Sequence, residues 1–247
     1  MKPQTASQRL AAGGSATAPH AIHRVIHFYA APIGKKVVMA LTGLILFGYV
    51  LAHMIGNLQI FSPDRGQLNH YAAFLHASSN LALLWLARFI LLGAVIWHIV
   101  AAVQLSKIKS DARPVGYVKK RDVPTSYAAR TMMWSGPIIA AFVIFHILHL
   151  TTGAVLPLKE VGANQPDVRY NVVSGFQNPF VTGFYILAMV LLCMHLYHGL
   201  WSLCQSLGWI SPRHNQKIKT TSAVLAIVIC VGFISVPLAV LAGLVTY

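Results

Sequence analysis

Five long apolar segments constrain this chain more than any other feature of its sequence. Each is near or above the ~20 residues that a helix needs to cross a ~30 Å hydrocarbon core. Inside lipid, backbone polar groups must be satisfied within the protein, so each segment is expected to be an α-helix. The sequence therefore predicts an all-α fold, an integral membrane bundle of five transmembrane helices. The predicted spans are residues 37–61, 81–105, 132–156, 180–207 and 223–245.

The composition agrees with a membrane protein and excludes other classes. Of the 247 residues, 56% are hydrophobic and 10% are charged, whereas soluble domains carry about 25% charged residues. The net charge of +14 suggests a nucleic-acid partner, but the basic residues lie in the connections between apolar segments and form no single patch. We therefore expect no nucleic-acid partner. Cys193, Cys204 and Cys230 form no CxxC pair, which argues against iron–sulfur or zinc ligation.

The distribution of Lys and Arg predicts the orientation in the membrane, because cytoplasmic connections are enriched in these residues. The N-terminal side and the second and fourth connections are basic, whereas the first and third carry few basic residues. The N-terminus is therefore predicted to be cytoplasmic and the C-terminal Tyr247 to lie outside. The basic residues on the predicted cytoplasmic side are Lys2, Arg9, Arg24, Lys35, Lys36, Lys107, Lys109, Arg113, Lys119, Lys120, Arg121, Arg130, Arg213, Lys217 and Lys219.

The first 27 residues differ from the rest of the chain. They are polar, rich in Gly, Ala and Ser, and mildly basic, without the pattern of a signal peptide. We interpret residues 1–27 as a flexible or partner-docking tail and residues 28–247 as one membrane domain.

Histidines within the apolar segments carry the functional signal. Ionisable groups in lipid are costly and are functional candidates by default. No Asp or Glu lies inside the five segments, so a proton relay or carboxylate ion site lacks its usual partners. Imidazole is the commonest metal ligand, and a haem iron accepts one on each face. Haem ligation is therefore favoured, although any single histidine could instead form a hydrogen bond between helices. The six histidines are His53, His98, His146, His149, His195 and His198.

The depths of four of these histidines match in pairs. At ~1.5 Å rise per residue, His53 lies ~12 Å and His146 ~15 Å from the outer ends of their helices. By the same measure His98 lies ~27 Å and His195 ~24 Å from the outer ends. A haem between two helices needs one ligand from each at the same depth. The depths therefore pair His53 with His146 outside and His98 with His195 inside, as two stacked haems require.

Other polar residues leave alternatives open. His149 and His198 each follow a proposed ligand by three residues and lie near the same helix face. Either could replace that ligand or bond to a haem propionate. Arg88, ~12 Å from the outer end of its helix, could neutralise a propionate, hold a quinone, or extend toward the outer interface. His70 and Tyr71 are further candidates for a quinone region near the outer side.

Three stretches of the sequence resemble a known family. They are GKKVVMALTGLILFGYVLAHMIGNLQIF at 34–61, FVIFHILHLTTG at 142–153 and MHLYHGLWSL at 194–203. They resemble the first, third and fourth helices of the cytochrome b subunit of succinate dehydrogenase, in the five-helix, di-haem b558 type shared with some fumarate reductases. The resemblance extends from about residue 28 to the C-terminus.

The resemblance implies two haem b groups with four axial ligands. The positions that match the family's ligands are His53, His98, His146 and His195. His98 and His195 would bind the iron of the haem nearer the cytoplasm, and His53 and His146 that of the distal haem. On this resemblance His198 is not a ligand.

The resemblance also implies partners and an activity. Family members anchor a flavoprotein subunit and an iron–sulfur subunit at the bacterial cytoplasmic (inner) membrane and exchange electrons with quinone, often menaquinone. The chain would then be the membrane subunit of an enzyme, succinate dehydrogenase of the tricarboxylic acid cycle or fumarate reductase, and would not bind the dicarboxylate itself. Cys193 departs from members that carry a Glu at this position, which is implicated in proton movement. The alternatives are a cytochrome b subunit of a hydrogenase or formate dehydrogenase, and a haem-free anchor or permease.

Overall fold

A computed structural model describes residues 17–112, 127–161 and 165–247. Within these residues the chain is mostly helical, and five helices are long and apolar enough to cross a membrane. The prediction of an all-α bundle with five membrane helices is confirmed. In chain order the helices are α2 (Thr17–Ala30), α3 (Pro32–Leu58), the short 3₁₀ helix η1 (Gln59–Phe61), α4 (Gln67–His76), α5 (Leu81–Asp111), α6 (Tyr127–Leu150), α7 (Val168–Phe176), α8 (Pro179–Ser206) and α9 (Asn215–Leu241).

Local chemistry explains where helix ends differ from the predicted spans. Helix α3 begins at Pro32, earlier than predicted, because proline suits the first turn of a helix. Helix α6 ends at Leu150, before the predicted residue 156, and the chain turns at Gly153, whose φ of +71° favours glycine. Helix α8 begins just after Asn178, whose side chain accepts hydrogen bonds from the first backbone amides of the helix.

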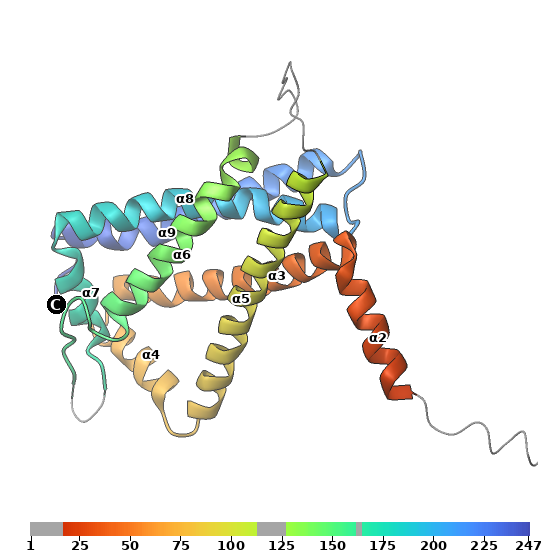
Figure 1. Cartoon of the computed structure of the whole chain (residues 1–247). Coiled ribbons are helices and arrows are strands. Elements are labelled where there is room, and N and C mark those ends of the chain that lie inside the picture. The colour runs from red at the N-terminus through yellow and green to blue at the C-terminus, as the bar shows by residue number, and fades with distance from the viewer. Residues whose placement is uncertain (1–16, 113–126, 162–164) are drawn as a thin grey trace, which may run out of the picture.

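Part of the predicted N-terminal tail is helical. Helix α2 begins at Thr17, so the residues from there to 27 are helical, while residues 1–16 lie outside the described residues. The Lys35 ammonium donates to the carbonyl oxygens of Tyr29 at 3.0 Å and Ala30 at 2.6 Å. The Tyr29 hydroxyl donates to Gln104 on α5 at 2.8 Å. These bonds fix the end of α2, which leaves the bundle at a steep angle to α3 (Figure 1).

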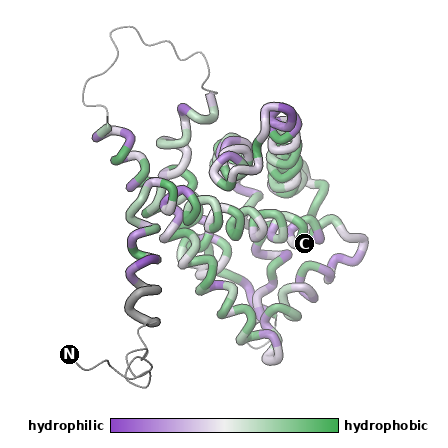
Figure 2. Tube along the Cα trace, turned by 90° about the vertical axis from the view of Figure 1, so that its right-hand side faces the viewer, coloured by the Kyte–Doolittle hydropathy of each residue, from purple (hydrophilic) through white to green (hydrophobic). Residues whose placement is uncertain are grey.

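The long helices pack as one bundle with apolar surfaces. Helices α3, α8 and α9 lie side by side, while α5 crosses on α3 and α6 crosses on α8 (Figure 1). Figure 2 shows hydrophobic residues over most of these helices, with hydrophilic residues mainly in connections and on α2. Many large apolar side chains on the long helices are exposed, as Phe89 on α5 and Ile144 on α6 are. Such outward apolar surfaces suit lipid as the surrounding solvent.

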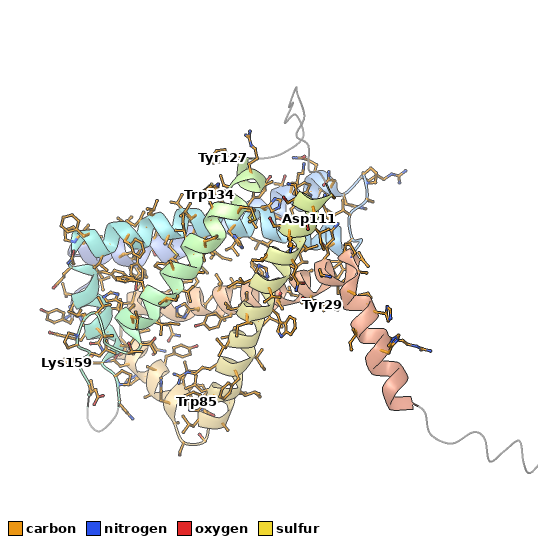
Figure 3. The ribbon with its side chains drawn as sticks, in the orientation of Figure 1. Tyr29, Trp85, Asp111, Tyr127, Trp134 and Lys159 are labelled. Atoms are coloured by element: carbon orange, nitrogen blue, oxygen red, sulfur yellow. The ribbon has the colours of Figure 1, made fainter. Side chains whose placement is uncertain are left out.

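The connections that the Lys and Arg pattern assigns to one side share one end of the bundle. The start of α3, the end of α5 and the starts of α6 and α9 lie there (Figure 1). Figure 3 shows Asp111 and Tyr127 near this end and Lys159 at the other. The structure contains no membrane, so the cytoplasmic N-terminus stays a prediction. Lys2, Arg9, Arg113, Lys119, Lys120 and Arg121 lie outside the described residues.

The predicted outer end is closed by η1, α4, α7 and the C-terminal residues, which we call the outer cap. Arg169 of α7 donates to the carbonyl oxygen of Ile60 at 3.0 Å and to that of Thr246 at 2.9 and 3.1 Å. Asn69 of α4 donates to Asp167 at 2.9 Å and accepts from the Arg169 amide at 3.0 Å. Burial lowers the pKa of the Arg169 guanidinium, which stays charged because arginine is protonated at any ordinary pH. The buried Arg169 guanidinium therefore links α7 to η1 and to the C-terminal residues.

Candidate functional site

Two pairs of histidines lie inside the bundle. The ring centres of His53 on α3 and His146 on α6 are 5.8 Å apart. The ring centres of His98 on α5 and His195 on α8 are 6.3 Å apart. All four side chains are half-buried. The structure therefore brings these residues together in the pairs that the depths predicted, and their role as ligands stays a prediction.

The spacing of each pair suits two imidazoles on one metal ion. Metal–imidazole bonds are about 2 Å long, so two rings that bind one ion from opposite sides have centres roughly 6 Å apart. Each pair supplies two imidazoles from two different helices, which is the number that a six-coordinate haem iron takes from protein. The donor set therefore fits a haem at each pair.

Hydroxyl groups lie beside the inner pair, His98 and His195. Thr42 Oγ1 is 3.3 Å from His98 Nδ1, and Ser135 Oγ is 3.5 Å from His195 Nδ1. Ser135 is only 1% exposed. Because each Nδ1 faces a hydroxyl, the other ring nitrogen, Nε2, is the one that is left for a metal.

The outer pair, His53 and His146, has aromatic neighbours. The Tyr185 hydroxyl lies 3.2 Å from His146 Nδ1 and 2.9 Å from His149 Nδ1. His53 stacks on Tyr49, with ring centres 5.3 Å apart. A phenol hydroxyl thus takes the place at His146 that aliphatic hydroxyls take in the inner pair.

The structure places His149 apart from the outer pair. Its ring is 1% exposed and packs against Phe145 and Phe176. A Cβ added to Gly175 would lie 2.8 Å from this ring, so His149 fits tightly against α7. The ring that contacts His53 is that of His146. This placement favours His146 over His149 as the partner of His53.

His198 has a buried nitrogen with an unmet hydrogen-bonding capacity. Its Nδ1 has no hydrogen-bond partner within the described part of the chain, and its ring lies edge-on to Trp201 at 6.1 Å. Buried polar atoms are nearly always paired, and each exception calls for an explanation. The nitrogen, three residues after His195, is therefore available to a polar group of a bound cofactor.

Arg88 lies on an exposed face of α5. Its guanidinium carbon is 4.9 Å from the centre of the Trp85 ring. Tyr49, on α3, stacks on His53. The contact that Arg88 makes among the described residues is therefore with Trp85 on its own helix.

The two other outer candidates, His70 and Tyr71, lie in different places. A Cβ added to Gly56 on α3 would be 3.1 Å from the Tyr71 ring, which places Tyr71 one turn beyond His53. His70 is exposed, with Nδ1 3.7 Å from an Asp64 carboxylate oxygen. It lines a separate outer cavity of about 230 Å³. Of these two candidates, only Tyr71 is near the outer pair.

Several glycines face space that no atom of the described residues fills. A Cβ added to any of them would meet nothing within 4 Å. Such positions let a flat group approach the helix backbone, although they also suit close helix packing. The paired rings and the buried nitrogen of His198 fit a haem, and the open glycine faces leave room for a flat group or for lipid. The glycines are Gly48, Gly93, Gly136, Gly183 and Gly199.

Sequence reasoning missed Thr42, Ser135 and Tyr185. The first lies 56 residues from its histidine, the second 60 and the third 39. Ser and Thr are common in membrane helices as ordinary hydrogen-bonding groups. No spacing rule connects a hydroxyl on one helix to a histidine on another, so only the packing reveals these partners.

The five apolar helices define a multi-pass membrane protein of the helical-bundle class. The family model of the succinate dehydrogenase/fumarate reductase transmembrane subunit matches residues 118–234. This is just under half of the chain and includes His146 and His195, whereas His53 and His98 lie before it. The match supports the resemblance found in the sequence. Searches of curated proteins and of solved structures found no significant match.

Proposed function

We propose that this chain is the di-haem cytochrome b membrane-anchor subunit of a succinate:quinone oxidoreductase. It would pass electrons between the iron–sulfur subunit of the complex and a membrane quinone. The observation that carries the proposal is the presence of two histidine pairs at haem-ligand spacing. The match to the transmembrane subunit of succinate dehydrogenase and fumarate reductase supports the assignment to that complex.

The histidines divide between two haem b groups by depth. His98 and His195 would hold the haem nearer the cytoplasm, and His53 and His146 the distal one. When bound, the two haems would supply one-electron carriers that span the membrane. The two imidazoles of each pair would complete the protein ligation of a haem iron, which suits electron transfer instead of oxygen binding. His198 would donate a hydrogen bond to a propionate through its unpaired Nδ1.

The surroundings of His53 are the region we assign to quinone, with menaquinone as the expected type. Tyr49 stacks on His53, Tyr71 packs against α3 nearby, and Arg88 lies at the predicted depth of this pair. Quinone reduction needs protons and hydrogen-bond donors at the carbonyl oxygens, and phenol and guanidinium groups supply such donors. The flavoprotein and iron–sulfur subunits would dock at the opposite, basic end of the bundle.

The first test is a dithionite-reduced minus oxidised optical spectrum of the purified chain, with haem quantified per polypeptide. The protein is produced with haem supplied and with the soluble partners present. We expect a b-type α-band, two haems per chain, and co-purification with a flavoprotein and an iron–sulfur protein.

Each contrary outcome removes a different part of the proposal. A colourless preparation would leave a haem-free anchor or permease. Two haems together with a hydrogenase or formate dehydrogenase partner would keep the cytochrome and change the complex.

A further inference from the structure

We propose that three hydroxyl groups are positioning groups, each of which fixes the tautomer of one haem-ligating histidine. This inference rests on the proposed function. The hydroxyl–histidine pairs are Thr42–His98, Ser135–His195 and Tyr185–His146. Each hydroxyl would hold a hydrogen on Nδ1 of its histidine, so that Nε2 presents a free lone pair to the iron.

Thr42 is placed to accept a hydrogen bond from His98, because its own hydrogen faces two backbone carbonyl oxygens, Val38 at 2.7 Å and Met39 at 3.2 Å. A hydroxyl carries one hydrogen and two lone pairs. The Thr42 hydroxyl donates its hydrogen to the carbonyl oxygen of Val38 at 2.7 Å, one turn earlier on α3. The contact of 3.3 Å with His98 Nδ1 is then a hydrogen bond only if Nδ1 carries the hydrogen. The backbone of α3 therefore decides the tautomer of a ring on α5.

Ser135 repeats this arrangement on the other side of the inner pair. Its hydroxyl faces the carbonyl oxygen of Met132 at 3.4 Å and His195 Nδ1 at 3.5 Å. A carbonyl cannot donate, so both contacts are satisfied only when the hydroxyl donates to Met132 and His195 donates from Nδ1. Both distances are at the long end of the hydrogen-bond range. We therefore expect a smaller effect from Ser135 than from Thr42.

At the outer pair, the Tyr185 hydroxyl lies between two histidines, His146 and His149. Its single hydrogen can go to only one of the two Nδ1 atoms that face it, and the contact with His149 is the shorter, at 2.9 Å against 3.2 Å. With that hydrogen on the bond to His149, the phenol oxygen accepts from His146 Nδ1–H. Tyr185 is 6% exposed and meets Phe142 and Phe176 edge-on, which holds its hydroxyl in place.

The physical effect of such a bond is twofold. A partner on the far nitrogen of a metal-bound imidazole fixes the orientation of the ring and raises its basicity. A more basic ligand stabilises the oxidised iron more than the reduced iron. Removing the hydroxyl should therefore raise the midpoint potential of the haem that the histidine holds and leave the other haem unchanged.

The test uses the assembled complex with Thr42→Val, Ser135→Ala and Tyr185→Phe as single variants. The measurement is a redox titration of the two haems by their α-bands, with haem counted per chain. Thr42→Val and Ser135→Ala should raise the potential of one haem, and Tyr185→Phe that of the other. Loss of such a partner typically weakens a site 10- to 100-fold. A tenfold weakening of the oxidised form alone corresponds to ~59 mV for one electron.

Three matched variants remove hydroxyls that do not face these histidines. Thr131 bonds to a carbonyl of its own helix at 3.1 Å, Ser235 does so at 2.7 Å, and the Tyr170 ring packs on Tyr247. Thr131→Val, Ser235→Ala and Tyr170→Phe should leave both potentials unchanged. Thr42→Ser keeps the hydroxyl and should keep the parental potential, which separates hydrogen bonding from packing.

The possible failures are distinguishable. Two haems per chain with potentials that none of the three variants shifts would overturn this inference and leave the proposed function intact. The same holds if both potentials shift together in the variants, or if the matched controls shift them equally. A parental chain that never holds two haems would overturn the proposed function itself.

Discussion

The outer and inner histidine pairs differ in how the hydroxyl groups beside their Nδ1 atoms are held in place. At the outer pair, the Tyr185 hydroxyl is held among buried aromatic rings and is shared with His149, which packs against α7 of the outer cap. At the inner pair, the hydroxyls of Thr42 and Ser135 also bond to carbonyls of their own helices. The outer pair is therefore linked through His149 to the outer cap, whereas the hydroxyls of the inner pair are held by carbonyls of their own membrane helices.

Because only the outer pair is linked to the outer cap, a structural change in the cap should affect the two pairs differently. A continuous series of contacts runs from Gly175 on α7 to His149, then to Tyr185 and to His146. A change in the outer cap should therefore reach the outer haem. The inner pair lies near the opposite end, and its hydroxyls belong to α3 and α6, so the same change should leave it intact. Variants at each site should show whether the two sites are independent.

The largest expected effect is the loss of one haem. His53→Leu should remove the outer haem and His98→Leu the inner haem, because a haem with one axial histidine lacks half of its protein ligation. Haem per polypeptide should fall from two to one in each variant, and the two remaining spectra should differ. Loss of both haems from either single variant would show that the sites are not independent.

A large effect on stability is expected from Arg169→Met. The change removes three hydrogen bonds from a buried charge and leaves the carbonyl oxygens of Ile60 and Thr246 without these donors. Hydrogen bonds to charged groups contribute about 1.5–3 kcal/mol each, so the loss should be of the order of 3 kcal/mol or more. Thermal unfolding in detergent measures it, with Arg213→Met as an exposed control at the opposite end.

The outer haem should be released from Arg169→Met at a lower temperature than the inner haem. The reason is that the cap contacts the outer pair through His149 and Tyr185. Simultaneous release of the two haems would contradict a separate dependence of the outer pair on the cap.

A moderate effect is expected from Gly175→Ala. The added Cβ would lie 2.8 Å from the His149 ring, so the ring or α7 must shift. Overpacking of this kind typically costs about 1–3 kcal/mol. The displacement should alter the spectrum or potential of the outer haem, with Ser174→Ala on the same helix as the control. An unchanged outer haem would argue against the connection through His149.

The smallest effect is expected from Gly199→Ala. Gly199 lies one turn after His195, near the same helix face, and a Cβ there would meet no protein atom within 4 Å. Alanine should stabilise the haem-free helix by roughly 0.5–1 kcal/mol through its higher helix propensity. If the open face accepts the inner haem, occupancy of that haem should decrease in a haem titration while the outer haem is retained. Equal occupancy of both would assign this face to lipid.

Much of the architecture follows from local sequence properties. The five membrane helices were predictable because an apolar run of this length in lipid has to satisfy its own backbone. Helix ends were less predictable: the end of α6 at Leu150 depends on the turn at Gly153, and α2 begins within a segment that reads as a polar tail. The pairing of His53 with His146 and of His98 with His195 was predictable from depth alone, because the rise of a helix is constant.

The tertiary structure decided which groups complete each pair. His146 and His149 lie one turn apart on the same helix, and only the packing of α7 and Tyr185 separates their surroundings. Likewise, Thr42 and Ser135 acquire their histidine partners only when α3 meets α5 and α6 meets α8. The sequence by itself determined how deep each residue lies, since depth is set along one helix. Its neighbours across the bundle depend on how the helices are rotated and packed, which no single segment encodes.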